Sequence, residues 1–213
     1  SVSIEDLRYC FILAAILIFV STSSTAVSED NMNEPQYDNQ EDVYLISNIT
    51  ELNWIRNAPK EDYKLVDDIN ATPTRNWNNG KGWKPIGEQN YEFYGNLNGN
   101  GYTIRNLTIS RPSESGIGLI SISGEDAVIR NLELKGLKAT GDNRIGGLVG
   151  RNNGKLLNIE LEGRLTIDGR HYIGGVVGKS EYYSGRIGNV NVDVVINQSS
   201  TYSVESVGGI AGN

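Results

Sequence analysis

Apolar and polar residues alternate along the second half of the chain, from about residue 95 onward. The segments NIELEG and NVNVDVVIN carry an apolar side chain at every second position, which is the period of a strand with one buried face. Glycine, valine and isoleucine recur in the same half and disfavour helix. We therefore expect this half of the chain to consist of short β-strands.

A marker centred on asparagine repeats through these strands. It reads aliphatic, any residue, Asn, aliphatic, any residue, aliphatic, as in IRNLTI, IRNLEL, LLNIEL and IGNVNV. The marker asparagines are Asn106, Asn131, Asn158 and Asn189, and their near-even spacing can be read directly from these numbers. This spacing is the first sign of an internal repeat.

A glycine marker alternates with the asparagine marker, in IGLIS, GGLVG, GGVVG and GGIAG. Its matching positions, which are spaced much like the asparagines, are Gly118, Gly147, Gly175 and Gly209. The last three copies add a second core glycine, at Gly150, Gly178 and Gly212. Two interleaved markers with a common period indicate one structural unit repeated along the chain.

A period of roughly 30 residues also occurs in helical repeats, leucine-rich repeats and propellers. No helical half-repeat is visible, and the marker asparagine precedes the strand instead of following a run of spaced leucines. We predict an all-β chain in which each repeat forms one coil of a parallel β-solenoid, with about 25–34 residues per coil.

Stacked coils give both markers a physical role. Corners of coils about 4.8 Å apart must tolerate positive φ and close backbone approach, and glycine does both. Asparagines at the same place in successive coils can bond amide to amide as a ladder. The alternation predicts inward side chains at Leu132, Leu134, Ile159, Leu161, Val190 and Val192. It predicts outward side chains at Glu133, Glu160, Glu162, Asn191 and Asp193.

The region from 43 to 94 precedes the repeats and has a different pattern. Asn48 suits a helix N-cap with Glu51 three residues on, and the apolar residues that follow recur at helical spacing, which predicts a helix over 49–57. The segment YKLVDDINA is expected to form the first strand. The loop NWNNGKGWKPIG, rich in turn residues, follows it.

Two tryptophans in that loop, Trp77 and Trp83, are the candidate ligand contacts of the chain. Aromatic rings beside the start of a repeat array usually close its end, and we favour this interpretation. Stacking on a sugar is the alternative. The region 43–94 is therefore expected to combine a short helix with a capping role.

The amino-terminal region, residues 1–42, carries an apolar run and then a polar stretch. The run FILAAILIFV is about half the length needed to cross a bilayer, and a Ser-x-Ala pattern follows it, so we expect residues 1–26 to be a secretory signal peptide. Cys10, the single cysteine, would leave with it. Residues 27–42 are acidic and polar, which predicts a flexible leader. The mature chain would hold no membrane span.

Length and charge narrow the class of protein further. The chain has 213 residues, enough for one sizeable core, so we expect one elongated domain, with the solenoid over 95–213. The formal net charge is -7 and the basic residues are dispersed, which argues against nucleic-acid binding.

Catalytic chemistry is not evident in this sequence. His171 is the only histidine, so a His-Glu-x-x-His zinc site is excluded, and no nucleophile motif accompanies it. The outward carboxylates Glu133, Glu160 and Asp193 are expected at equivalent positions on successive coils, where a weak calcium stripe is less usual than a solvated face. A phosphate cradle needs a helix after its glycines, whereas each copy here precedes a strand. We expect no catalytic, cofactor or metal site.

The repeats resemble a known family. The stretches IGGLVGRNNGKLLN and IGGVVGKSEYYSGRIGN are similar to the GLUG motif, and VGGIAGN resembles the start of another copy. The first copy departs from the motif, with Ser121 in place of a core glycine. The resemblance implies a right-handed parallel β-helix in large secreted or surface-attached microbial proteins, including adhesin-like chains and proteins similar to IgA-specific metallopeptidases. It supplies no catalytic residues.

These observations predict an exported, non-catalytic β-solenoid that acts as a scaffold or adhesin-like segment of a longer surface protein. The chain stops inside a motif at Asn213, so we expect a missing carboxyl-terminal region through which the protein is attached to the cell. The expected partner is a host or cell-surface glycan or protein. Two alternatives stay open: the accessory region of a secreted metallopeptidase, and a carbohydrate-binding or carbohydrate-cleaving β-helix.

Overall fold

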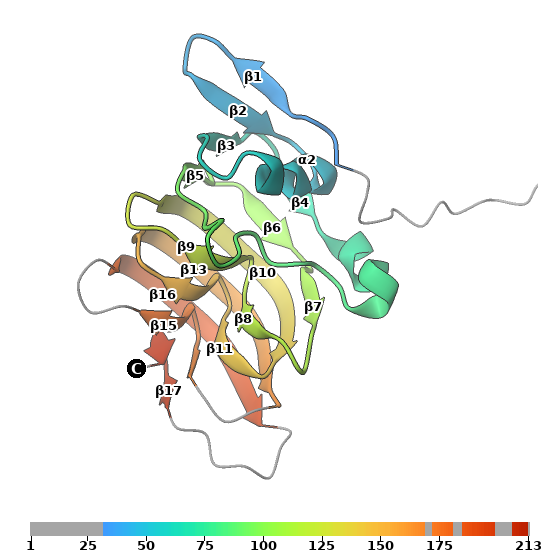
Figure 1. The fold of residues 1–213 in the computed structure, drawn as a ribbon, viewed down its shortest axis with the longest axis vertical. Coiled ribbons are helices and arrows are strands. Elements are labelled where there is room, and N and C mark those ends of the chain that lie inside the picture. The colour runs from blue at the N-terminus through green and yellow to red at the C-terminus, as the bar shows by residue number, and fades with distance from the viewer. Residues whose placement is uncertain (1–31, 169–171, 181–184, 199–205, 213) are drawn as a thin grey trace, which may run out of the picture.

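The computed structural model describes residues 32–168, 172–180, 185–198 and 206–212 (Figure 1). Within these ranges the chain consists mostly of strands, with one short α-helix. The strands form a parallel β-solenoid of about 4 coils. The fold predicted from the repeat pattern is therefore confirmed.

Each coil contributes strands to three sheets, one of ten strands and two of four. The first coil contains β5 (Asn96–Asn98), β6 (Thr103–Arg105), β7 (Thr108–Ser110), β8 (Ser115–Ile117) and β9 (Ile120–Ser123). The second contains β10 (Val128–Gly141), β11 (Asn143–Gly146) and β12 (Val149–Asn152). The third contains β13 (Lys155–Ile167), β14 (Ile173–Gly174) and β15 (Val177–Ser180). The fourth contains β16 (Arg186–Gln198), β17 (Val207–Gly208) and β18 (Ala211–Gly212).

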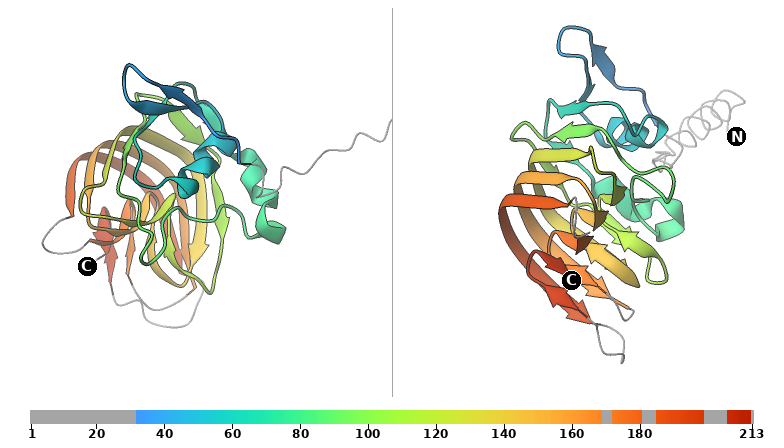
Figure 2. Two further views of the ribbon diagram at one scale, coloured as in Figure 1. Left: turned by 45° about the horizontal axis from the view of Figure 1, so that its top comes forward. Right: turned by 60° about the vertical axis from the view of Figure 1, so that its left-hand side comes forward.

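Neighbouring coils pair in parallel. Strand β10 pairs with β13, which places Leu132 opposite Ile159, and β13 pairs with β16, which places Ile159 opposite Val190. The short strands follow the same order, as β8-β11-β14-β17 in one sheet and β9-β12-β15-β18 in the other. Figure 2 shows the long strands β10, β13 and β16 as stacked, curved ribbons coloured from yellow to red. One repeat is therefore one layer of the stack.

The apolar positions of the repeats fill the inside of the coils, as the alternation predicts. Four of the six residues predicted to point inward are at most 2% exposed: Leu132, Leu134, Ile159 and Leu161. Val190 and Val192 are only half-buried, because β16 is the outermost described strand of its sheet. The exposed residues of the predicted outward set are Glu160, Glu162, Asn191 and Asp193, while Glu133 is half-buried.

Strands also stack before the first repeat. Strands β1 (Gln36–Asp38) and β2 (Val43–Ile46) pair antiparallel, and β2 pairs in parallel with β3 (Tyr63–Leu65). Strand β3 then pairs with β5, and β4 (Ile69–Asn70) pairs with β6. We call residues 32–94 the N-terminal layer. The segment YKLVDDINA is thus not the first strand, and it forms two short strands that continue the solenoid.

The predicted helix lies where its cap residues indicate. Helix α2 (Ile49–Trp54) continues as a 3-10 turn, η1 (Ile55–Asn57), so the predicted span is confirmed. The Oδ1 atom of Asn48 accepts hydrogen bonds from the backbone N–H groups of Thr50 and Glu51. The following loop holds two more 3-10 turns, η2 (Thr72–Asn76) and η3 (Asn78–Gly80).

The predicted flexible leader over 27–42 is wrong in its later half, where β1 forms. Its polar composition concealed an aromatic contact, because the ring of Tyr37 lies 4.8 Å from that of Tyr44 on the paired strand. The predicted signal peptide over 1–26, Cys10 and His171 lie outside the described residues. No helix in the described part of the chain is long and apolar enough to span a membrane.

Candidate functional site

An asparagine ladder runs along the outer surface of the ten-stranded sheet. Asn131 donates its Nδ2 to the Oδ1 of Asn98 at 3.1 Å, Asn158 donates to Asn131 at 2.9 Å, and Asn189 donates to Asn158 at 2.7 Å. The three steps span 33, 27 and 31 residues, one coil each. Each inner amide both donates and accepts, so the bonds polarise one another along the stack.

The predicted ladder included Asn106, and this assignment is wrong. Asn98 occupies that place, because β10 pairs with β5 immediately before Asn131. Asn106 follows β6, where its backbone N–H donates to the carbonyl of Lys135 and its Nδ2 donates to the Oγ1 of Thr72 at 3.1 Å. The letters IRNLTI match the marker, yet the first coil is longer than the distance from Asn106 to Asn131 suggests.

Three of the four ladder asparagines also shape the backbone. Their φ angles are 52° at Asn131, 55° at Asn158 and 52° at Asn189, in the left-handed region, which Asn98 does not adopt. Asparagine tolerates this region better than most residues with a side chain. Asn106 adopts it as well, with φ of 62°, so it keeps the backbone role of the marker without joining the ladder.

The glycine marker serves close approach only. None of its seven glycines has a positive φ, so the expectation of left-handed glycine corners is wrong. An added Cβ would lie 2.8 Å from the carbonyl oxygen of Leu148 at Gly118, and 2.6 Å from that of Gly175 at Gly147. The nearest backbone atoms would be 2.6 Å away at Gly150, 2.3 Å at Gly178 and 2.7 Å at Gly212. Backbone contacts this short leave no room for any side chain.

One marker glycine differs from the others. At Gly209, an added Cβ would meet nothing within 4 Å, whereas at Gly175 it would overlap the carbonyl oxygen of Gly209. Gly209 lies in the fourth coil, on which no described coil is stacked. The requirement for glycine therefore comes from the neighbouring coil and not from the turn itself.

The predicted carboxylate stripe is not continuous. Glu133 lies opposite Glu160, but Glu160 lies opposite Asn191, and Asp193 pairs instead with Glu162. The expected alignment is wrong because Asp193 lies beyond the register partner of Glu160, which the alternation of residue types does not reveal. Among the described residues, no group of three or more His, Cys, Asp or Glu side chains could hold a metal ion.

Ion pairs neutralise two carboxylates, Glu133 and Asp68, on the outer surface of the ten-stranded sheet. Glu133 pairs with Lys135 and accepts a hydrogen bond from Thr103, and these contacts lower the pKa of its carboxyl in that order. Asp68 accepts from the backbone N–H of Thr103 at 2.9 Å and pairs with Arg105 at 3.0 Å, which together lower its pKa. Both carboxylates are therefore engaged within the protein.

A shallow groove follows the ladder across the coils. Its lining residues are Gly101, Asn131, Leu132, Glu133, Asn158, Ile159, Glu160, Asn189 and Asn191. The groove displays amide donors and acceptors to solvent, together with the two carboxylates at its side. Its chemistry suits hydrogen bonding to a polar surface.

The tryptophan candidates lie in the core. Trp77 is 1% exposed and Trp83 is 0% exposed, with their ring centroids 5.9 Å apart and nearly parallel. The indole Nε1 of Trp83 donates to the carbonyl of Leu119 at 3.0 Å. Neither ring can stack on a sugar at the surface, so that alternative is wrong for these two residues. Their packing closes the N-terminal layer against the first coil, as the favoured interpretation expected.

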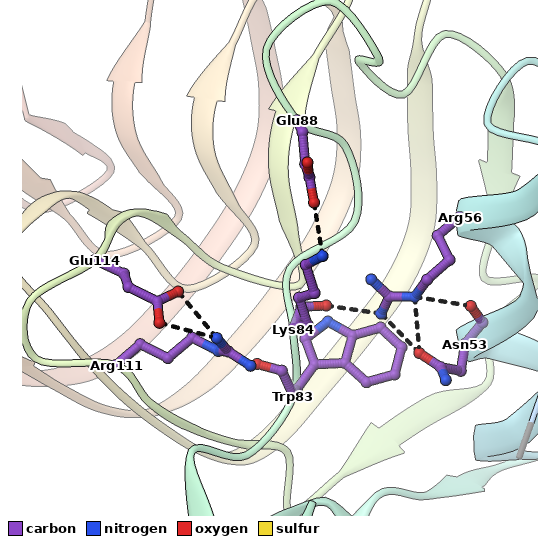
Figure 3. Close-up of polar contacts among 7 residues, drawn as sticks. All are labelled: Asn53, Arg56, Trp83, Lys84, Glu88, Arg111 and Glu114. Atoms are coloured by element: carbon purple, nitrogen blue, oxygen red, sulfur yellow. Dashed lines mark hydrogen bonds and ion pairs between the residues drawn. The ribbon is translucent and has the colours of Figure 1, made fainter. Parts of the chain in front are cut away.

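Two arginines fix Trp83 from either side, which the sequence did not reveal (Figure 3). The guanidinium of Arg56 lies over the indole, 5.2 Å from the ring centroid, and its Nη2 donates to the carbonyl of Lys84 at 2.8 Å. The Nε of Arg111 donates to the carbonyl of Trp83 at 2.9 Å, and its Nη1 pairs with Glu114. The Arg56 cation over the indole face adds stability through the cation–π interaction. Arg111 is buried, and its charge is compensated by the pair with Glu114.

Two known proteins resemble this chain in sequence. Halomucin from Haloquadratum walsbyi is 42% identical over 145 residues, which is 66% of this chain and 2% of halomucin. A putative Gly-rich membrane protein from Evansella cellulosilytica is 33% identical over 157 residues, which is 71% of this chain and 18% of that protein. The chain thus spans a small part of either relative. No protein-family model and no solved structure matches it.

Proposed function

We propose that this chain is a non-catalytic scaffold segment of a much longer, surface-associated protein. The observation that carries the proposal is the stack itself: each coil pairs with its neighbours through the same three sheets and the same asparagine ladder. An architecture of this kind gains length by adding coils, because each repeat contacts only the next.

The relatives support a segment that acts within a longer chain. The matched part is 2% of halomucin and 18% of the putative Gly-rich membrane protein. A segment of similar size that matches two proteins of very different length is more readily a structural unit than a complete enzyme. The name of the second relative places that protein at a membrane, which supports a surface location here.

The finer assignments are also part of the proposal. The resemblance to GLUG-motif repeats rests on the glycine and asparagine markers, and it favours an adhesin-like role with export through the predicted signal peptide. Attachment would come from a region carboxyl-terminal to the coils. The accessory role in a metallopeptidase stays an alternative, and no contact of the described residues favours it.

Surface labelling of intact producing cells tests the proposal. Antibodies raised against this chain should label the cells without lysis, and a protease that does not enter the cells should remove the label. An antibody against a cytoplasmic protein of the same cells provides the control for leakage. Label that appears only after lysis would contradict the surface location.

A further inference from the structure

A hollow beside the first coil combines exposed aromatic rings with donors and acceptors of hydrogen bonds. We call it the tyrosine hollow, and its principal lining residues are Lys60, Asn90, Tyr91, Glu92, Tyr94 and Asp126. Tyr91 is 75% exposed and Tyr94 is 37% exposed. Two exposed aromatic rings that line the same hollow, beside polar groups, form a surface suited to contact with a ligand.

The loop that carries Tyr91 is held in place by a chain of contacts. Tyr91 and Glu88 exchange two backbone hydrogen bonds, of 2.9 and 3.1 Å, across a tight turn. The carboxylate of Glu88 pairs with Lys84 at 2.8 Å, and the carbonyl of Lys84 accepts from Arg56 at 2.8 Å (Figure 3). The exposed ring is therefore presented by a loop anchored to the buried Trp83, which reduces the ordering cost of binding.

Tyr94 forms the other wall and is equally well seated. Its backbone N–H donates to the carbonyl of Pro59 at 2.8 Å. Its ring lies against Gly124 so closely that a Cβ at this position would overlap the ring. The Tyr94 hydroxyl lies 3.4 Å from the Oε2 of Glu92, which directs its polar end toward the carboxylate. The flat face of the ring is thus fixed by the glycine behind it.

We infer that the tyrosine hollow binds a neutral oligosaccharide. Tyrosine faces pack against the apolar C–H faces of sugar rings while their hydroxyls still reach polar groups. Lys60 and Asn90 can donate hydrogen bonds, and Glu92 and Asp126 can accept them. Sugar hydroxyls both donate and accept, so this mixture suits them better than it suits an ion of either sign.

A second hollow on the other side of Tyr91 indicates that the ligand is a chain and not a single sugar. It shares Pro59 and Tyr91 with the first hollow and adds Arg56, Lys84 and Glu88. An extended ligand can therefore cross the exposed ring and contact both hollows. This site is independent of the scaffold role, because it depends on the N-terminal layer and the edge of the first coil and not on the number of coils.

Calorimetric titration of the whole chain with a panel of neutral hexaoses tests the inference. The panel contains β-1,4-linked glucose, xylose, mannose and N-acetylglucosamine and α-1,4-linked glucose. At least one hexaose should bind, and Tyr91→Ala should weaken binding by about tenfold, equal to roughly 1.4 kcal/mol. Tyr37→Ala, which removes an exposed tyrosine from β1, is the matched control and should leave the affinity within about twofold.

Thermal unfolding of each variant shows whether the fold is retained, which the exposure of Tyr91 leads us to expect. Absence of binding by every hexaose would overturn the inference. Binding that survives Tyr91→Ala unchanged would also overturn it, because the sugar would then lie elsewhere. Binding of a mixed-sequence peptide library in place of any sugar would assign the hollow to a different class of ligand and equally overturn it.

Discussion

The N-terminal layer and the repeated coils continue the same sheet with different side chains. Among the residues that the structure describes, the four largest fully buried side chains all lie in the N-terminal layer: Trp77, Trp83, Tyr63 and Phe93. The core of the coils is built from Leu, Ile, Val and Ala, with glycines where backbones meet. A coil that rests on an identical coil needs only small, repeated residues. The first layer has no such template, and large rings fill its irregular space.

Removing the central ring of the N-terminal layer should have the largest effect. Trp83→Ala deletes a side chain with no exposed surface and should lower the free energy of unfolding by about 3–5 kcal/mol, measured by denaturant titration. Trp54→Ala, in the same layer but only half-buried, is the control and should cost less. Equal losses at both positions would mean that Trp83 does not anchor this layer.

Close approach between coils should have the next largest effect. Gly147→Ala places a Cβ 2.6 Å from the carbonyl oxygen of Gly175 and should cost about 1–3 kcal/mol of unfolding free energy. Gly209→Ala meets nothing within 4 Å and should cost under about 0.5 kcal/mol. A similar loss for both variants would contradict the role of the stacked coil in requiring glycine.

The ladder separates a backbone effect from a hydrogen-bond effect. Asn158→Ala loses the amide bonds and must also keep a φ of 55° with an unsuitable side chain, so it should cost about 1–3 kcal/mol. Asn158→Gly tolerates this φ, loses the exposed amide bonds and should cost only about 0.5–1 kcal/mol. Asn143→Ala, outside the ladder, should cost under about 0.5 kcal/mol in the same denaturant titration. Equal losses for the alanine and glycine variants would mean that the amide bonds, which both variants lose, dominate over the backbone effect.

Alkaline pH should weaken the N-terminal layer, with the smallest effect of this series. Burial raises the pKa of the Tyr63 phenol, whose hydroxyl donates to the carbonyl of Ala58 at 2.6 Å. Its pKa in the folded protein thus exceeds its pKa in the unfolded chain. The contribution of Tyr63 to the free energy of unfolding is therefore complete below about pH 10 and decreases as the pH rises further. Above about pH 10, the unfolding temperature of the unmodified chain should fall more steeply with pH than that of Tyr63→Phe. Identical pH profiles would exclude Tyr63 as the cause.

The repeat pattern was sufficient to predict the coils, because stacking imposes the same residue types at each level. Alternation placed Leu132 and Ile159 inside and Glu160 outside, and Asn48 marked the start of the helix. These are local signals, carried by neighbouring residues. They need no knowledge of which coil lies beside which.

Register and long-range contacts were not predicted in the same way. Asn98 was missed because the first coil is longer than the later ones, so matching letters selected Asn106. The partner of Glu160 could have been found, because Asn191 follows the marker Asn189 by two residues just as Glu160 follows Asn158, whereas matching by charge selected Asp193. Arg56, in η1, and Trp83 are brought together only by the tertiary fold, and no sequence spacing indicates that contact. The tyrosine hollow joins loops far apart in sequence for the same reason.

Disulfide trapping tests the stacked register most directly, in a Cys10→Ser background that removes the native cysteine. Glu160 and Asn191 are register partners on adjacent parallel strands, so cysteines at these positions should lie about 5 Å apart and cross-link under mild oxidation. Cysteines at Glu160 and Asp193 are the control pair: Asp193 is displaced along its strand from the partner of Glu160, so this pair should stay reduced, as judged by gel mobility after digestion. Cross-linking of the second pair in place of the first would contradict the arrangement of the coils described above.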